Sequence, residues 1–401
     1  MKTTRIIRIR HPRLKLVLGI AGAACLLVVL ALSFAMHRIS GPMSHQQAAD
    51  RWQGGGTLRY QQISVFRSVD GGLRAATIEA AGESIKAKLE EAGIPDASYL
   101  IAYGAEASKS AVSENGKASL AMTMVGGDFF QIHNFSFLSG APFQPEDVMQ
   151  DRVVLDELAA WQLFSSNNCV GMEVVINGKL HIVAGVVAQE TDRATKECYG
   201  DAPRAYVSYS YWNTATESGD AANNALTPVT FCEAVLPEPV DEFAISTLAS
   251  AISVDKSEIV NNTARYGLEP LLANLNGLHM QGILSNAVVY PYWESAARLS
   301  ANRCSLLLIP IFIFLLLPAG WAVYGLVCLW RLIKAGGHGV VSLADCAVER
   351  RRTRIYLQTQ TRERQSKERM DYDDQMQSLD PDALSSVGGS RSGDDAGSLR
   401  R

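Results

Sequence analysis

The sequence lacks the patterns that carry catalysis. Gly171–Lys179 ends in Asn-Gly-Lys, but its spacing is wrong for a phosphate-binding loop and is typical of a hairpin. The seven histidines are scattered and no His-Glu-x-x-His motif occurs, so a zinc site is not expected. Ser139-Gly140 lacks the context of a nucleophile elbow. We therefore predict that the chain is not an enzyme and binds no cofactor or metal, and that any ATP energy comes from another chain.

Cysteine is also sparse, and its seven positions follow no metal-ligand spacing. Only Cys169, Cys198 and Cys232 fall in the central part of the chain, away from the long apolar runs. Because three is an odd number, one internal disulfide at most can form there. We predict the pair Cys198–Cys232, with isolated thiols as the alternative.

Two long runs contain no Asp, Glu, Lys or Arg. Leu16–Met36 and Cys304–Trp330 are each long enough to cross about 30 Å of hydrocarbon as a helix. Neither run contains a histidine, so neither predicts an ion or proton relay of its own. Gly19 and Ala23 form a small-xxx-small pattern that would let another helix approach closely, with packing against lipid as the alternative.

The charges beside these runs predict an orientation. Six cations precede the first run and six lie within residues 331–354 after the second, whereas the flanks that border 37–303 carry few. Since cations stay on the cytoplasmic side, both termini are predicted to be cytoplasmic and 37–303 to lie outside, in a multi-pass plasma-membrane protein. The alternative is that the first run is a cleaved signal peptide, but its apolar core is longer than the usual 7–15 residues. The formal net charge of −4 hides a distribution that is basic at both predicted membrane faces and mildly acidic in between, and we predict the lipid bilayer and no nucleic acid as a partner.

The sequence thus predicts six consecutive parts. They are a basic cytoplasmic N-terminus (1–15), a first membrane helix (16–36), an outer domain (37–303), a second membrane helix (304–330), a charged, helical cytoplasmic segment (331–379) and a disordered tail (380–401). The outer part could be one domain or two subdomains.

The outer part begins with a β-α-β-β order. Thr57–Arg67 has strand composition, Leu73–Ala92 is an amphipathic helix, and Ser98–Val112 and Lys117–Val125 are strands joined by a turn at Asn115-Gly116. This order predicts an α+β fold with helices on one face of a sheet.

Further elements follow in the same pattern. They are a strand at Val153–Leu155, a helix at Glu157–Phe164 capped by Asp156, a hairpin about Asn177-Gly178, strands at Tyr206–Tyr209 and Val229–Leu236, a helix at Asp241–Ile252, and a helix at Leu268–Asn302 that runs into the second apolar run. Tyr206, Tyr209, Tyr211 and Trp212 lie beside a polar loop, and we predict that they contact a partner or substrate.

One stretch of the outer part resembles a known family. Val125-Gly-Gly-Asp-Phe-Phe-Gln-Ile is followed by Phe137-Leu-Ser-Gly-Ala-Pro-Phe143, Arg152-Val-Val-Leu-Asp-Glu157 and Val183-Ala-Gly-Val-Val187. In this order and spacing, Thr123–Ala188 resembles the periplasmic core domain of MacB-like ABC-transporter permeases.

The resemblance implies a function. Family members carry a large outer domain between their first two membrane helices, and an ATPase drives it from the cytoplasm. The implied partners are a cytoplasmic ATPase subunit and, since no third apolar run follows Trp330, a full-length permease. The chain is then expected to be a reduced, permease-like subunit. The alternative is an extracellular sensor or scaffold that keeps the fold without transport and makes an intracellular contact through Ser342–Leu379.

Overall fold

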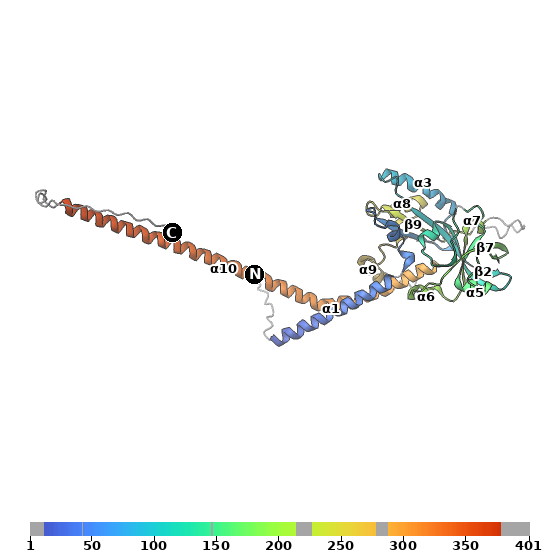
Figure 1. Ribbon diagram of the computed structural model, residues 1–401, viewed down its shortest axis with the longest axis horizontal. Helices are drawn as coiled ribbons and strands as arrows, with labels where there is room; N and C mark the ends of the chain where they lie inside the picture. Colours follow the sequence, from blue (N-terminus) through green and yellow to red (C-terminus); the bar gives the residue numbers. More distant parts are fainter. Residues whose placement is uncertain (1–11, 42, 146, 214–226, 278–287, 378–401) are drawn as a thin grey trace, which may run out of the picture. The chain divides into compact units, whose positions relative to one another are not determined.

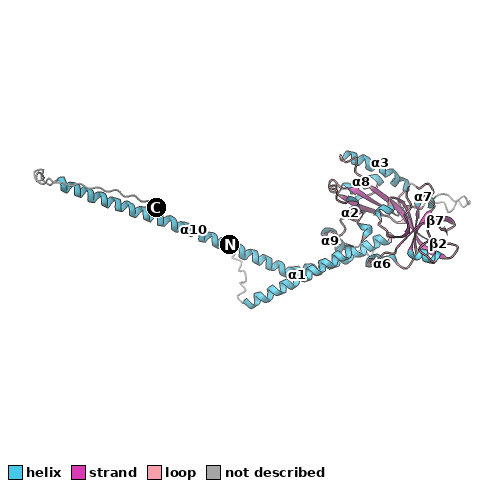
Figure 2. Cartoon of the chain, viewed as in Figure 1, coloured by secondary structure: helices cyan, strands magenta, loops and turns pink. Residues whose placement is uncertain are grey.

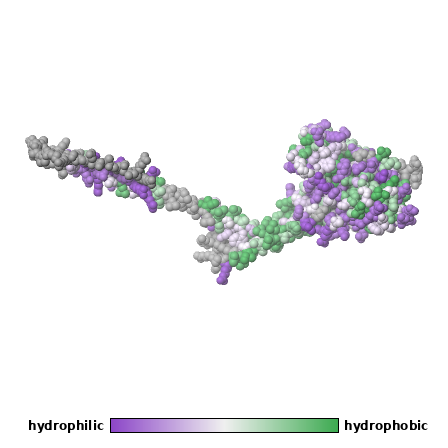
Figure 3. All heavy atoms as spheres, in the orientation of Figure 1, coloured by the Kyte–Doolittle hydropathy of each residue, from purple (hydrophilic) through white to green (hydrophobic). Residues whose placement is uncertain are grey.

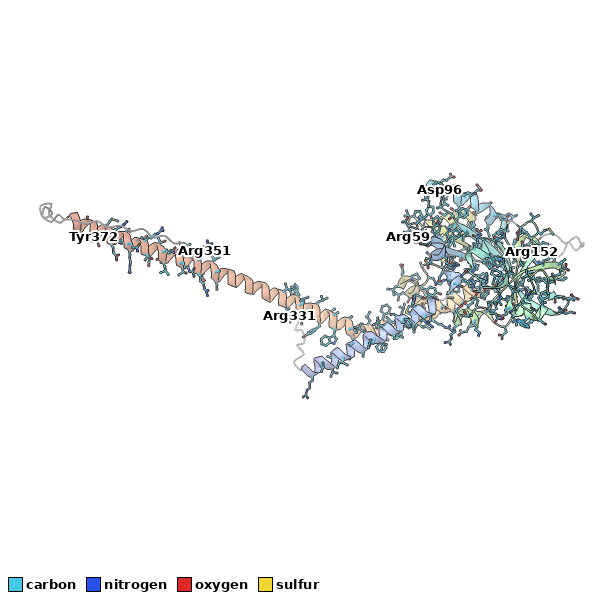
Figure 4. All side chains as sticks on the ribbon, in the orientation of Figure 1. Arg59, Asp96, Arg152, Arg331, Arg351 and Tyr372 are labelled. Carbon is cyan, nitrogen blue, oxygen red and sulfur yellow. The ribbon has the colours of Figure 1, made fainter. Side chains whose placement is uncertain are left out.

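The computed structural model describes residues 12–41, 43–145, 147–213, 227–277 and 288–377. It divides into two compact units, Met1–Pro318 and Ala319–Arg401. The first unit contains helix α1 (Pro12–Ser40), the outer domain and the beginning of helix α10 (Tyr292–Gln377). The second contains the rest of α10, and Figure 4 shows Arg331, Arg351 and Tyr372 as side chains along that part.

Two helices are long and apolar enough to cross a membrane, Leu16–Ser40 and Tyr292–Arg331. They contain the two apolar runs predicted from the sequence, and hydrophobic residues dominate the surface of α1 (Figure 3). The helical structure predicted after the second run is confirmed as far as Gln377. The predicted tail 380–401 lies outside the described residues.

The described strands of the outer domain form one sheet, drawn in magenta in Figure 2. Its order is β10-β1-β9-β2-β3-β8-β5-β7-β4, and β6 pairs with β2 and β7. The strands are β1 (Tyr60–Phe66), β2 (Leu100–Val112), β3 (Lys117–Gly127), β4 (Phe137–Gly140), β5 (Arg152–Asp156), β6 (Glu173–Ile176), β7 (Lys179–Val187), β8 (Arg204–Ser208), β9 (Phe231–Pro237) and β10 (Ile259–Asn261). Because the described strands all belong to one sheet, the outer domain does not separate into two subdomains with a sheet each.

Helices cover both faces of this sheet, so the prediction of helices on one face is wrong. The remaining helices are α2 (Ala48–Gln53), α3 (Ala75–Glu91), α4 (Phe129–Ile132), α5 (Glu157–Phe164), α6 (Arg193–Tyr199), α7 (Tyr209–Asn213), α8 (Phe243–Ile252) and α9 (Leu268–Gly277). On one face α3 and α8 lie side by side (Figure 1), with α5 in the same hydrophobic cluster. The opposite face is covered by α2, α4 and the first turn of α10.

Strand alternation explains this two-sided core. In β9, Cys232 and Ala234 point into the cluster of α3 and α8, whereas Phe231 and Val235 point into the cluster of α2 and α4. All seven residues of β9 are buried, because both faces of a central strand are covered.

The predicted turns and caps are confirmed where the structure describes them. Asp156 caps α5, since its Oδ1 accepts a hydrogen bond from the Ala159 N–H at 2.7 Å. Asn177 and Gly178 have φ values of 47° and 83°, as a tight hairpin between β6 and β7 requires.

The Gly126-Gly127-Asp128 motif lies at the open end of the β2–β3 hairpin, where β3 ends beside the beginning of β2. Gly127 has φ +64°, and a Cβ there would lie 2.2 Å from the Ile101 carbonyl oxygen. Asp128 accepts from the Ile101 N–H at 3.0 Å through Oδ2, and its own N–H donates to the Ile101 carbonyl at 2.7 Å. The motif therefore builds the scaffold and turns the chain into α4.

The predicted single helix over Leu268–Asn302 is interrupted. Helix α9 ends at Gly277, residues 288–291 are not helical, and α10 begins at Tyr292. Pro291 lies just before this start, and its carbonyl accepts the Ser295 N–H at 2.9 Å. Proline has no N–H of its own, so it fits the beginning of a helix and not its interior.

Candidate functional site

The outer domain is joined to its two apolar helices by buried polar contacts. We call this set the junction network: His45, Gln62, His133, Glu233, Arg265, Trp293 and Glu294. All seven residues are buried, on the sheet face that carries α2 and α4 or at its border with α10. Buried polar groups of this kind need partners, and the partners here come from segments far apart in the sequence.

The segment that follows α1 is held by Gln62 of β1. The side chain of Gln62 donates to the His45 carbonyl at 2.7 Å and accepts from the Ala48 N–H at 2.9 Å. Gln62 is fully buried, so both hydrogen bonds are shielded from water. The chain that leaves the first apolar helix is thereby tied to the sheet.

The first turn of α10 is held in the same region. Trp293 Nε1 donates to Glu233 of β9 at 2.8 Å, and the hydroxyls of Tyr292 and Tyr206 lie 3.1 Å apart. Trp293 also packs its ring against Phe231. The second apolar helix therefore starts from an aromatic and hydrogen-bonded anchor in the central sheet.

Glu294 forms a buried ion pair with two arginines. Arg265 donates to both carboxylate oxygens, at 3.1 and 2.7 Å, and Arg298 Nε donates at 2.7 Å. Arg265 also donates to Asn262, which in turn donates to Ser64 of β1. Bidentate arginine–carboxylate geometry fixes orientation as well as distance.

A row of histidines and carboxylates crosses the junction. His45 Nε2 lies 2.8 Å from Glu190 Oε1, His45 Nδ1 lies 3.2 Å from His133 Nδ1, and His133 Nε2 lies 3.2 Å from Glu233 Oε2. Burial lowers the pKa of His133, which keeps its ring neutral at neutral pH.

The two histidines of this row have different neighbours. The His45 ring faces both Glu190 and His133. His133 faces Glu233 with both side chains fully buried, so burial, which lowers the pKa of His133, is opposed by the nearby carboxylate, which raises it.

The outer ends of the two apolar helices also meet. Cys304 and Leu308 of α10 pack with Met36 and Ile39 of α1 and with Leu271 of α9. The Cys304 sulfur lies 3.9 Å from the Met36 carbonyl oxygen. These are the residues at which the two apolar runs were predicted to leave the membrane.

The structure places the predicted contact residues in two groups. Tyr206 is fully buried, and Tyr209 is 6% exposed with its ring against Tyr103. The prediction is wrong for these two, because both rings fill the core and neither can meet a partner. Tyr211 and Trp212 are partly exposed and hold Lys179, whose Nζ donates to both of their carbonyls. A contact through this pair stays a prediction.

The predicted disulfide is not formed. Cys198 and Cys232 are both free thiols. Cys232 points from β9 into the cluster of α3 and α8, whereas Cys198 of α6 packs beside Ala194 and Ala296 in another cluster. Strand alternation fixed the direction of Cys232, which spacing along the sequence could not indicate.

Gly19 and Ala23 are exposed on α1. Apart from its chain neighbours and the backbone of its own helix, no atom of the described residues lies within 4 Å of the position that a Cβ on Gly19 would take. This face is open to another helix, and that contact stays a prediction.

Sequence reasoning missed the junction network. Its members come from 45, 62, 133, 233, 265 and 293–294, and no spacing links them. The only available signal was Glu294, a carboxylate shortly before a long apolar run. Among the described residues, no group of three or more His, Cys, Asp or Glu could hold a metal ion.

These observations define a class: an α/β outer domain built between two apolar helices, with polar contacts concentrated where the helices join it. The family described as MacB-like periplasmic core domain has a model that matches residues 16–251. The chain belongs to this family, which is a component of ABC-type transporter permeases.

Two solved structures are similar to the chain. The periplasmic region of MacB from Actinobacillus actinomycetemcomitans shares 17% identity, with 50% of this chain and 89% of that chain covered and a TM-score of 0.35. The extracellular domain of the ABC-type transporter YknZ from Gram-positive bacteria shares 14% identity, with 51% and 99% covered and a TM-score of 0.33. No curated protein matched the chain.

Proposed function

We propose that the chain is a permease-like subunit of a MacB-type ABC transporter system. Its outer domain couples conformational change, or the handling of a partner or substrate, to an ATPase on another chain. The observation that carries this proposal is the junction network, which ties both apolar helices to one sheet.

The network supports coupling for a mechanical reason. Packed interiors deform little, so displacement of a helix end must move the sheet or break buried hydrogen bonds. Glu233 lies in the middle of β9, a central strand, and Trp293 reaches it directly from the first turn of α10. Motion at the outer ends of the helices is thus passed to the whole outer domain.

The proposal predicts recovery of a partner from native membranes. Gentle extraction and affinity purification of the full chain should recover an ATPase subunit or a complete permease. We expect Gly19→Leu to reduce that recovery, because the added side chain fits this chain but fills the face offered to another helix. Ala24→Leu, an exposed change of similar size on another face of α1, is the matched control. A chain that stays monomeric under all gentle conditions would contradict the proposal.

We also propose that the two helices cross the membrane with both termini in the cytoplasm and the outer domain on the opposite side. Epitope tags fused at either end should be protected in intact cells and become accessible after permeabilisation. A tag placed next to Asp96, which is exposed on the outer domain (Figure 4), should be accessible without permeabilisation. Accessibility of either terminal tag in intact cells would contradict this orientation.

A sensor or scaffold role is the second candidate. The observation that favours it is the helical segment after the second apolar run, whose Ile355, Tyr356 and Tyr372 are exposed within their unit. Deletion of 342–401 separates the two functions. Assembly through the helices and outer domain should survive the deletion, whereas a signalling contact through the segment should be lost.

A further inference from the structure

A cleft of about 520 Å³ lies between α9, β10 and the beginning of α10. We call it the junction cleft. It is lined by Val260, Asn261, Ala264, Arg265, Pro270, Asn274, Tyr290, Arg298, Ala301 and Asn302. Its volume lies within the range of small-molecule sites, and its walls combine apolar side chains with amides and arginines.

The cleft lies at the outer end of the apolar helices. Ala301 and Asn302 precede Cys304 by less than one helical turn. Cys304 packs against Met36, where the other apolar run ends. Two runs delimited independently in the sequence thus meet at one level, and the cleft opens just beyond it. At that level a membrane presents its phosphate headgroups.

The charge of the cleft suits an anion. Its lining includes Arg265 and Arg298 but no Asp or Glu. Both arginines pair with Glu294, which is fully buried, so the three side chains together carry one net positive charge.

Arg298 is the arginine that remains accessible. Its side chain is 41% exposed, and its guanidinium lies 3.8 Å from the centre of the Tyr290 ring. Its Nε is used by Glu294, and no hydrogen bond occupies its two terminal nitrogens among the contacts of the described residues. Stacking and pairing hold the guanidinium in place before any ligand arrives, and its fork geometry matches a phosphate.

We propose that the junction cleft binds the phosphate of an anionic glycerophospholipid from the leaflet next to the outer domain. Arg298 is the main contact. Val260, Ala264, Pro270 and Ala301 offer apolar surface to the glycerol and the first acyl carbons. The net positive charge favours an anionic headgroup over a zwitterionic one. A bound lipid would brace α9 against α10 directly beside the junction network.

The test uses the full chain in detergent, with phosphatidylglycerol or phosphatidylcholine added to the micelles. Native mass spectrometry counts the lipid that remains bound. We expect the wild type to retain phosphatidylglycerol in preference to phosphatidylcholine, and Arg298→Gln to lower this retention about tenfold. Glu294 keeps Arg265 in that variant, so the domain should remain folded.

Arg303→Gln is the matched control. Arg303 is on the same helix at nearly the same level, but it pairs with Glu197 and does not line the cleft. Its loss should leave lipid retention unchanged. If Arg298→Gln lowers the melting temperature by more than a few degrees, Arg298→Lys replaces it. Lysine keeps the positive charge but lacks the two parallel N–H groups of a guanidinium. We therefore expect this variant to retain less phosphatidylglycerol than the wild type and more than Arg298→Gln.

Three results would overturn the proposal. In the first, Arg298→Gln retains as much phosphatidylglycerol as the wild type. In the second, Arg303→Gln loses as much lipid as Arg298→Gln, which would indicate unspecific attraction. In the third, inorganic phosphate displaces the lipid at equal concentration, which would indicate a site for a free anion.

Discussion

Replacing Glu294 by alanine should lower the free energy of unfolding by about 3–5 kcal/mol, because it leaves a buried arginine without its carboxylate. The Arg265 side chain is 8% exposed and that of Glu294 is fully buried, so water cannot replace the lost partner. Thermal unfolding of the full chain in detergent, followed by tryptophan fluorescence, should show a fall of roughly 10 °C.

Two further variants show whether the lost ion pair is responsible. Arg193→Ala removes the exposed Arg193–Glu197 pair and should cost at most about 1 kcal/mol. The double variant Arg265→Met, Glu294→Leu removes both charges and should recover most of the loss, since no buried charge is then left alone. A fall for Glu294→Ala no larger than that for Arg193→Ala would contradict the assignment.

Acid should destabilise the outer domain through His181. This side chain is fully buried in β7, neither ring nitrogen has a hydrogen-bond partner among the described residues, and the Tyr211 ring centre lies 5.2 Å from that of His181. Burial, aided by the charge of Lys179, lowers the pKa of His181 from 6.5 to about 4. Between these values the unfolded chain binds a proton that the folded chain does not. The stabilisation is therefore complete above about pH 6.5 and falls by about 3 kcal/mol as the pH drops to about 4.

The variant His181→Leu isolates this effect from the carboxylates, which also titrate in acid. Leucine has no polar atoms to leave unpaired, so the variant should be more stable at pH 7 by about 1 kcal/mol. Its loss of stability between pH 7 and pH 4 should be smaller than that of the wild type by about 3 kcal/mol. Equal acid sensitivity in the two proteins would show that His181 is not the titrating group.

The buried charges of the junction network affect stability in two different ways. They contribute little net stability compared with apolar side chains of the same size, yet removal of one partner is costly. Such a network specifies one arrangement of helices and sheet. The histidine row brings His133 Nε2 to 3.2 Å from Glu233 Oε2, the same Glu233 that Trp293 of α10 contacts.

The sequence predicted the elements that depend on local patterns. Apolar residues recur at every second position on both sides of an Asn-Gly turn, at Val174 and Ile176 and at Ile182, Ala184 and Val186, so the hairpin could be predicted without the fold. Asp156 before an apolar helical segment indicated its own role as a cap. The two apolar helices followed from length and the absence of charge alone.

The sequence could not predict which neighbouring elements the side chains on each face of a central strand contact. Whether a sheet is covered on one face or both depends on segments distant in the chain, here the segment after α1 and the first turn of α10. That coverage buried Tyr206, separated Cys198 from Cys232 and brought His45, His133 and Glu233 into one row.

Hydropathy and local periodicity by themselves determined that this chain has a folded domain between two apolar helices, because each signal lies within one short segment. The tertiary structure alone decided that both helices join the same sheet through buried polar contacts. Those contacts link residues as far apart as Glu233 and Trp293, or Gln62 and Ala48, and only the paired strands bring them together. Such a contact leaves no periodic pattern in the sequence, because the two residues come together only after the sheet has formed.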